Sequence, residues 1–184
     1  GITYRLACKG ETKEIHVAVP GSFTVYNSLA AIATAREEGI AWEPILEALS
    51  EMNGVKGRIE RIPTKTPYSV FIDFAHTPDA LENILKNLRE FTTGRLITLF
   101  GCGGDRDPIK RPIMGHIGVK LADFAVITSD NPRTEDPMSI IEDILKGVKE
   151  EDGAYIVVED RKTAIRYAMD IAQKDDIIVL AGKG

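Results

Sequence analysis

The chain has 184 residues, enough for one complete domain and part of another, and 43% of them are hydrophobic, as in a globular protein with a buried core. Its formal net charge of −5 argues against a general binder of nucleic acids or anionic membranes, although a few local arginines could hold an anionic substrate. No apolar run approaches the ~18–20 residues of a membrane span, and the start does not resemble a secretion signal. Since Gly1 is not a natural first residue, the true N-terminus is expected to lie outside this sequence.

The cysteines and histidines predict neither a disulfide nor a structural metal site. Cys8 and Cys102 lie far apart in sequence and form no CxxC pair, so both are expected to be reduced thiols in a cytosolic protein. The three histidines show no metal-ligand spacing among themselves or with the cysteines.

The first 60 residues predict two strands followed by two helices. Residues 2–8 and 14–19 alternate between apolar and polar side chains around a polar turn, which is typical of a β-hairpin. Residues 21–40 and 41–54 have apolar side chains at helical spacing, and each segment ends near a glycine. These elements are too few to fold alone, so we interpret residues 1–60 as the tail of a preceding domain.

After Glu60 the pattern changes to short β-branched or aromatic runs that alternate with segments of helical period. The predicted strands are residues 69–75, 95–101, 123–129, 154–159 and 176–182. The predicted helices are residues 77–91, 107–122, 136–150 and 160–174. Thr77, Asp107 and Asp136 each precede a proline and are expected to be helix N-caps. We therefore predict an α/β fold in residues 61–184, with a doubly wound, mostly parallel sheet.

Ligands of an open parallel sheet bind at the carboxyl ends of the strands. The loops expected there read DFAHTPD, FGCGGDRD, TSDNPRTED, VEDRKT and AGKG, and polar residues concentrate in the first three. The second loop is not a dinucleotide fingerprint or a P-loop, because Arg106 replaces the third glycine and no Gly-Lys-Ser/Thr follows. Its glycines let the backbone approach a ligand with Arg106 aimed at it, or they form a tight turn in which Arg106 pairs with Asp105 or Asp107.

Three further polar residues have both a functional and a structural interpretation. Asp73 either binds a cation or hydroxyl or accepts a hydrogen bond from a neighbouring loop, and His76 either contacts a ligand or caps the next helix. Arg58 either contacts a phosphate or forms an interdomain ion pair. Asn27 is by default a satisfied core amide. Ordinary solvated charges are expected at Lys56, Lys110 and Arg111.

Six motifs occur together in one order along the chain: GSFTVYNSLAAIATA, GVKGRIE, DFAHTPDAL, FGCGGDRDPIKRPIMG, SDNPRTED and AGKG. In this order they resemble the ATP-dependent Mur ligases over essentially the whole chain, most of all the members that add meso-diaminopimelate. The resemblance implies that residues 1–60 are the C-terminal part of a central ATP-binding domain. It also implies that residues 61–184 are most of a Rossmann-like C-terminal domain that binds the amino acid.

The reaction implied by the resemblance is amide formation in bacterial peptidoglycan synthesis, in the cytoplasm. Family members use ATP and magnesium to phosphorylate a carboxylate of UDP-N-acetylmuramoyl-L-Ala-D-Glu, and the amine of meso-diaminopimelate then displaces phosphate. Neither nucleic acid nor a membrane is an expected partner. Because no P-loop and no UDP-sugar domain occur in the sequence, we expect the isolated chain to be inactive. No catalytic residue is assigned in it, and most magnesium ligands are expected outside it.

The resemblance assigns four residues to ATP: Asn27 on the adenine side, Arg58 at the phosphates, Asp73 at or near the ribose, and His76 of the A-H-x-P motif.

The resemblance also assigns five residues to the amino acid. Arg106, Asn131 and Arg133 match the diaminopimelate pocket, Asp130 supports them, and Gly182 makes a backbone contact. An arginine fork can grip the distal carboxylate of diaminopimelate, which L-lysine lacks. A site built around such a partner can reject the analogue that lacks it by ~10⁴-fold. The alternatives are a folylpolyglutamate synthetase-like enzyme, a lysine-adding Mur ligase and a non-catalytic nucleotide-binding α/β module.

Overall fold

The computed structural model describes residues 1–8, 10–19, 21–52, 54–149 and 152–183. The chain forms two compact units, Gly1–Gly54 and Val55–Gly184. No helix in these described ranges is long and apolar enough to cross a membrane.

The two units divide a few residues before the boundary expected near Glu60. The reason is a hydrogen bond that ties the intervening segment to the second unit. The backbone N–H of Ile59 donates to Asp73 Oδ2 over 2.9 Å, so this segment belongs to the sheet domain that follows it.

The first unit contains the predicted hairpin and two helices. Strands β1 (Ile2–Cys8) and β2 (Glu11–Val17) pair antiparallel in continuous register, and β2 begins inside the expected turn. Helices α1 (Phe23–Glu37) and α2 (Trp42–Glu51) follow, as the apolar spacing predicted.

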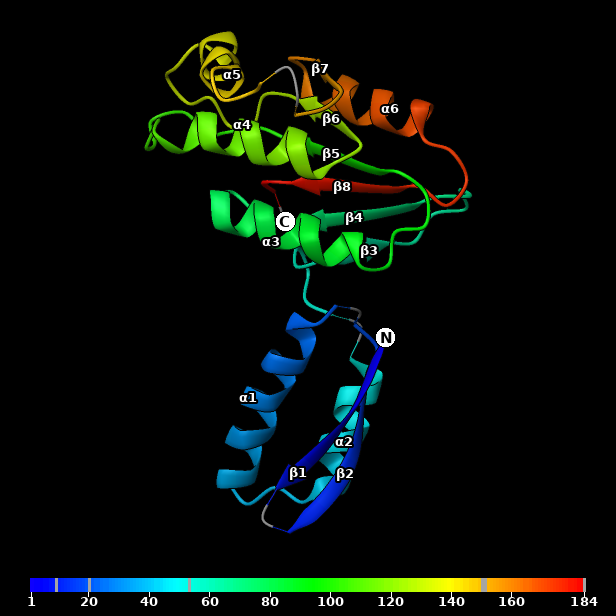
Figure 1. Ribbon diagram of the computed structural model, residues 1–184. Coiled ribbons are helices and arrows are strands. Elements are labelled where there is room, and N and C mark those ends of the chain that lie inside the picture. Colours follow the sequence, from blue (N-terminus) through cyan, green and yellow to red (C-terminus); the bar gives the residue numbers. More distant parts are fainter. Residues whose placement is uncertain (9, 20, 53, 150–151, 184) are drawn as a thin grey trace. The chain divides into compact units, whose positions relative to one another are not determined.

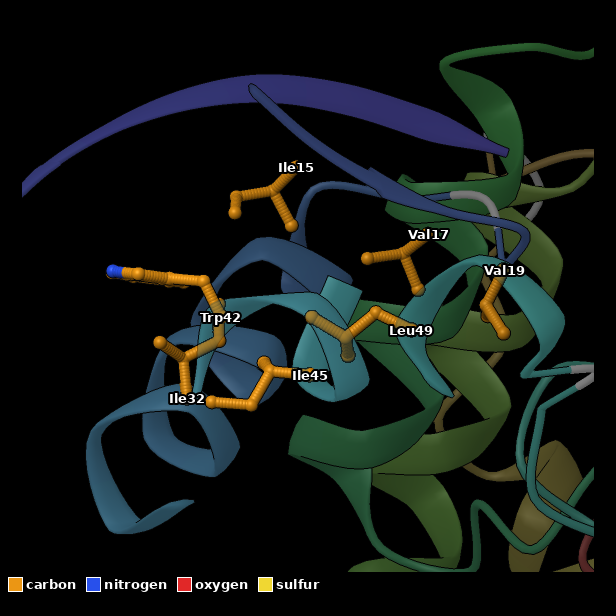
Figure 2. Packing of buried hydrophobic residues seen from close by; sticks show 7 residues of the cluster. All are labelled: Ile15, Val17, Val19, Ile32, Trp42, Ile45 and Leu49. Carbon is orange, nitrogen blue, oxygen red and sulfur yellow. The ribbon is translucent and has the colours of Figure 1, made fainter. Parts of the chain in front are cut away.

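A small apolar core holds this unit together. Figure 2 shows its side chains pointing toward one another from β2, the segment directly after it, α1 and α2; they are Ile15, Val17, Val19, Ile32, Trp42, Ile45 and Leu49. Burial of a large aliphatic side chain contributes about 1.5–3 kcal/mol, so this cluster is the main stabilising feature of the unit. The cations of Lys13 and Arg36 lie 5.9 and 5.0 Å from the centre of the Trp42 ring.

The second unit is built on a six-stranded sheet in the order β3-β4-β8-β5-β6-β7 (Figure 1). The strands are β3 (Glu60–Ile62), β4 (Ser69–Asp73), β5 (Leu96–Phe100), β6 (Phe124–Ile127), β7 (Tyr155–Val157) and β8 (Ile177–Ala181). Only β3 is antiparallel to its neighbour, and the sequence did not predict it. The predicted doubly wound, mostly parallel sheet is confirmed.

Helices cover both faces of this sheet. They are α3 (Pro78–Arg89), α4 (Lys110–Leu121), α5 (Pro137–Leu145) and α6 (Arg161–Ile171). Helix α4 contacts both α3 and α5, and its Gly118 lies against Phe100. Helix α6 packs on the side chains of the opposite face, including Leu99 and Ile178. Adjacent residues of one strand, Leu99 and Phe100, therefore point to different helix layers, as a two-residue period requires.

Two of the three predicted N-caps are confirmed. The Thr77 hydroxyl accepts from the N–H of Ala80, and the Asp136 carboxylate accepts from the N–H of Ser139. The cap expected at Asp107 is wrong because its Oδ1 accepts from the N–H of Ile109 in a turn that precedes the helix. Helix α4 consequently begins only at Lys110.

Candidate functional site

A cavity of about 600 Å³ opens at the carboxyl ends of the parallel strands in the second unit. The loops after β4, β5, β6 and β8 all contribute to its lining, as the sheet topology requires. Six residues singled out from the sequence line this cavity: His76, Arg106, Asp130, Asn131, Arg133 and Gly182. The remaining three, Asn27, Arg58 and Asp73, are not among its lining residues.

Positive charge dominates the cavity although the chain as a whole is acidic. Besides the two arginines, Lys110 and Lys183 line it, against the carboxylates of Asp107 and Asp130. Lys110 was expected to be an ordinary solvated charge, but its Nζ donates to the carbonyl of His76 over 2.7 Å. Such a cavity suits an anionic ligand such as a carboxylate or phosphate.

Arg133 presents most of its guanidinium to the cavity. Its backbone is in the left-handed region with φ of 51°, an unfavourable conformation for a residue with a side chain. One nitrogen, Nη1, donates to the carbonyl of Gly104 over 2.6 Å. Within the described ranges the side chain makes no other hydrogen bond, so its remaining N–H groups can bind a ligand.

Asp130 supplies an acceptor that the protein leaves open. Its side chain is 12% exposed, and Oδ1 lies 3.4 Å from Lys183 Nζ. This oxygen is buried and accepts no hydrogen bond from any described residue. A buried carboxylate oxygen without a donor is costly, and an ammonium or N–H group of a ligand would satisfy it.

Gly182 brings the backbone of the β8 end close to this carboxylate. Its φ of 100° favours glycine, and an added Cβ would lie 3.7 Å from Asp130 Oδ2. The N–H of Gly182 already donates to the Asp73 carbonyl over 3.0 Å. A backbone contact from Gly182 to a ligand would therefore use its carbonyl.

The Asp73 carboxylate is engaged by backbone donors. Its Oδ1 accepts from the N–H of Ala75 over 2.8 Å, and its Oδ2 accepts from that of Ile59. These contacts match the structural interpretation of Asp73, because one oxygen shapes the loop after β4 and the other holds the segment that precedes β3.

Arg58 and His76 are linked through an aromatic ring. The guanidinium of Arg58 lies 5.1 Å from the Phe74 ring centre, and the His76 ring packs edge-on against the same ring. His76 Nδ1 lies 2.9 Å from the Phe74 carbonyl, so this nitrogen is assigned as the donor and Nε2 as the acceptor. Thr77, rather than His76, caps α3.

Asn27 belongs to the first unit, where it is exposed on α1. The default interpretation of Asn27 as a satisfied core amide is therefore wrong.

The glycines of the β5–α4 loop allow it to pack closely against the β6–α5 loop. A Cβ added to Gly101 would collide with the Thr128 carbonyl, and one added to Gly104 would collide with the Pro132 carbonyl. The N–H of Gly104 also donates to the Asn131 carbonyl over 2.9 Å. Neither interpretation from the sequence included this close approach, because the partner residues lie about 30 positions away.

Arg111 is not a solvated charge. Its side chain is buried, with ion pairs of 2.7 Å to Glu135 and 2.9 Å to Asp143. Hydrogen bonding from Arg111 is the largest cause that lowers the pKa of Glu135 below its usual value. No local spacing around Arg111 indicates this arrangement.

Both cysteines are free, as predicted. Burial raises the pKa of Cys102 to about 11, so its thiol stays protonated and is not a nucleophile at neutral pH. Its Sγ lies 3.7 Å from Met114 Sδ in the core beneath the cavity loops.

The sequence profile of the Mur ligase, glutamate ligase domain matches residues 57–184, which include the whole sheet and the cavity. The chain belongs to the Mur ligase family. This confirms the family expected from the six motifs.

Members of the Mur ligase family align with the whole chain. It is 51% identical over 186 residues to UDP-N-acetylmuramoyl-L-alanyl-D-glutamate--2,6-diaminopimelate ligase 1 of Clostridium acetobutylicum, covering 100% of this chain and 38% of that protein. A solved structure of a UDP-N-acetylmuramoyl-L-alanyl-D-glutamate--2,6-diaminopimelate ligase superposes with a TM-score of 0.71 at 36% identity, over 99% of this chain and 37% of that one. The chain thus spans well under half of the length of these relatives.

A folylpolyglutamate synthase of Mycobacterium tuberculosis has a similar fold. It superposes with a TM-score of 0.73 at 18% identity, over 98% of this chain and 44% of that one. At this identity the likeness shows the fold alone.

Proposed function

We propose that this chain is part of a cytoplasmic ATP-dependent ligase that adds meso-diaminopimelate to UDP-N-acetylmuramoyl-L-Ala-D-Glu in peptidoglycan precursor synthesis. The observation that carries the proposal is the convergence of Arg106, Asn131 and Arg133 on one cationic cavity, where Asp130 Oδ1 accepts no hydrogen bond from the described residues. The name of the Clostridium acetobutylicum relative supports the same substrates.

The cavity has complementary groups for the far end of a diamino diacid, which carries one ammonium and one carboxylate. The open N–H groups of Arg133, with Arg106 beside the same cavity, suit the carboxylate. Asp130 Oδ1, which lies 3.4 Å from Lys183 Nζ but accepts no hydrogen bond from the described residues, suits the ammonium. Lysine would satisfy Asp130 but leave both arginines without an anion, and its ammonium would face them.

Magnesium does not fit this chain by itself. Among the described residues no group of three His, Cys, Asp or Glu side chains could hold a metal ion. We therefore expect most magnesium ligands to come from other parts of the intact protein.

The chain does offer cations for the phosphates of ATP. Lys110 and Lys183 line the cavity, and Arg58 lies against Phe74, which lines it too. When bound, ATP supplies the phosphoryl group that turns a carboxylate into an acylating group. The role of this chain is then to bind the diamino acid by one end so that the amine at its other end remains free to attack. We assign no catalytic residue within the chain.

A substrate screen on the intact protein tests the proposal. Phosphate release from ATP is followed with UDP-N-acetylmuramoyl-L-Ala-D-Glu and meso-diaminopimelate, lysine or ornithine. We expect kcat/KM for diaminopimelate to exceed that for lysine by ~10⁴-fold, because only diaminopimelate pairs the arginines. Equal use of lysine would refute the assignment, and ATP binding without turnover would favour a non-catalytic module.

A further inference from the structure

Glu135 joins the two loops that carry the cavity arginines. It lies on the β6–α5 loop, and its Oε1 accepts from the backbone N–H of Asp105 over 2.6 Å. The same oxygen accepts from Arg111 Nη2 over 2.7 Å. Arg111 is only 3% exposed, and its Nη1 donates to Asp143 Oδ2 on α5 over 2.9 Å. A buried cation thus anchors the carboxylate that bridges the loops.

Asp105, on the β5–α4 loop, makes a second link to the β6–α5 loop through its own carboxylate. Its carboxylate accepts from the Thr134 hydroxyl over 2.7 Å and from the Thr134 backbone N–H over 3.2 Å. The hydrogen bond from the Thr134 side chain is the largest cause that lowers the pKa of Asp105. The two loops are therefore linked in both directions by neighbouring residues, Thr134 and Glu135.

These contacts hold two residues in unfavourable backbone conformations. Asp105 and Arg133 both have φ of 51°, in the left-handed region that few residues with side chains adopt. Such conformations persist only where the surrounding structure holds them. Arg106 follows Asp105 directly, and Arg133 lies two positions before Glu135, so the place of each arginine depends on this link.

We propose that Glu135, anchored by Arg111, is a positioning residue that fixes the separation of Arg106 and Arg133 and thereby sets the affinity for the distal carboxylate of the diamino acid. Neither Glu135 nor Arg111 lines the cavity, so the effect passes through the two arginines. This inference rests on the proposed function for its ligand, whereas the link between the loops is independent of it.

The chain provides a matched pair of variants for the kinetic test. Glu135→Ala and Asp143→Ala each remove one carboxylate from Arg111, but only Glu135 also holds the β5–α4 loop. In the intact protein we expect Glu135→Ala to raise KM for meso-diaminopimelate on the order of 10–100-fold, as a displaced binding group does. KM for ATP should change less than about threefold, since Arg58, Asp73 and His76, which the resemblance assigns to ATP, lie outside the two linked loops.

The control and the conservative variant complete the design. Asp143→Ala should keep KM for diaminopimelate within about threefold of the parent value, and Glu135→Gln, which retains an acceptor oxygen, should restore most of the affinity. An unchanged KM in Glu135→Ala, or an equal rise in Asp143→Ala, would overturn the inference.

Hydrogen exchange separates this inference from the proposed function. In the intact protein without ligand, the amides of residues 101–108 and 129–136 should exchange at least about tenfold faster in Glu135→Ala than in Asp143→Ala. Equal exchange would overturn the inference even if diaminopimelate is the substrate. Faster exchange together with a failed substrate screen would leave the loop link standing and refute the proposed function alone.

Discussion

The two ends of strand β8 use the same kinds of residues in opposite ways. At its amino end, Asp176 is 3% exposed and accepts from the backbone N–H of Arg95, the guanidinium of Arg95 and the N–H of Gln173. At its carboxyl end, Gly182 lies beside Asp130, whose buried Oδ1 accepts no hydrogen bond from the described residues. One carboxylate is fully satisfied and the other is not.

This difference separates a structural ion pair from a binding site. Arg95 donates from Nε and Nη2 to Asp176 and from Nη2 to the carbonyl of Ile171, so these donors serve the fold. Arg133 uses one nitrogen on Gly104 and directs the rest into a cavity. A buried polar atom without a hydrogen bond is costly, so the Oδ1 of Asp130, a residue that lines the cavity, suits a ligand donor.

The largest effect should come from removing the open arginine. In the intact protein, Arg133→Ala should raise KM for meso-diaminopimelate on the order of 100-fold, because charged hydrogen bonds to a carboxylate are lost. KM for ATP and the melting temperature should change little, since the side chain is exposed and makes one protein hydrogen bond. Comparable losses for both ligands would count against the assignment of Arg133.

Replacing Asp176, the satisfied carboxylate, should lower stability rather than ligand affinity. Asp176→Ala should lower the free energy of unfolding by about 2 kcal/mol, because Arg95 and two backbone donors lose their acceptor. This loss of stability is smaller than for a fully buried ion pair because the Arg95 side chain is 38% exposed. Denaturant unfolding measures this loss, and Asp170→Ala on the exposed side of α6 is the control. A selective loss of diaminopimelate affinity in Asp176→Ala would contradict the assignment of Asp176 to a structural ion pair.

The fold was predictable because its signals are local. Apolar runs set the five parallel strands, and Thr77 and Asp136 mark helix starts by capping within three residues. The three-residue strand β3 has too short a pattern to be recognised. Asp107 carries the same cap signal as Asp136, but it closes a turn instead, and only the tertiary structure decides between them.

The sequence predicted which residues gather at the cavity, but not the hydrogen bonds and ion pairs among them. Six residues could be placed together because loops after parallel strands share one edge of the sheet. The burial of Arg111 and the bridge from Glu135 depend on partners 24 to 32 residues away, which no local spacing reveals. The open oxygen of Asp130 is likewise a property of its surroundings, since its sequence context is that of an ordinary turn.

A smaller effect should follow from crowding the two cavity loops. Gly104→Ala places a Cβ against the Pro132 carbonyl, so the loops must separate, at a cost of about 1–2 kcal/mol in the free energy of unfolding. Gly103→Ala is the matched control, because its Cβ would come closest to the side-chain end of Arg133, at 2.9 Å, and would make only an ordinary contact of 3.6 Å with the Asn131 carbonyl. Both variants should weaken diaminopimelate binding, but only Gly104→Ala should lower the melting temperature clearly. Equal melting temperatures would show that the loops tolerate separation.

The smallest expected effect is on the free energy of unfolding at acid pH. Burial alone would raise the pKa of Asp176, but the hydrogen bonds from Arg95 and Gln173 outweigh it and hold that pKa below the usual value in the folded protein. The carboxylate therefore contributes stability above about pH 4, where it is ionised in both states, and this contribution is lost as the pH falls below that value. Each additional proton bound on unfolding gives a slope of about 1.4 kcal/mol per pH unit.

Replacing Asp176 should consequently flatten the acid side of the stability curve. Denaturant unfolding of Asp176→Ala between about pH 5 and pH 3 should show a shallower loss than the parent chain, whereas Asp170→Ala should match the parent. Equal flattening in both variants would show that Asp176 is not the source of the acid-side loss of stability.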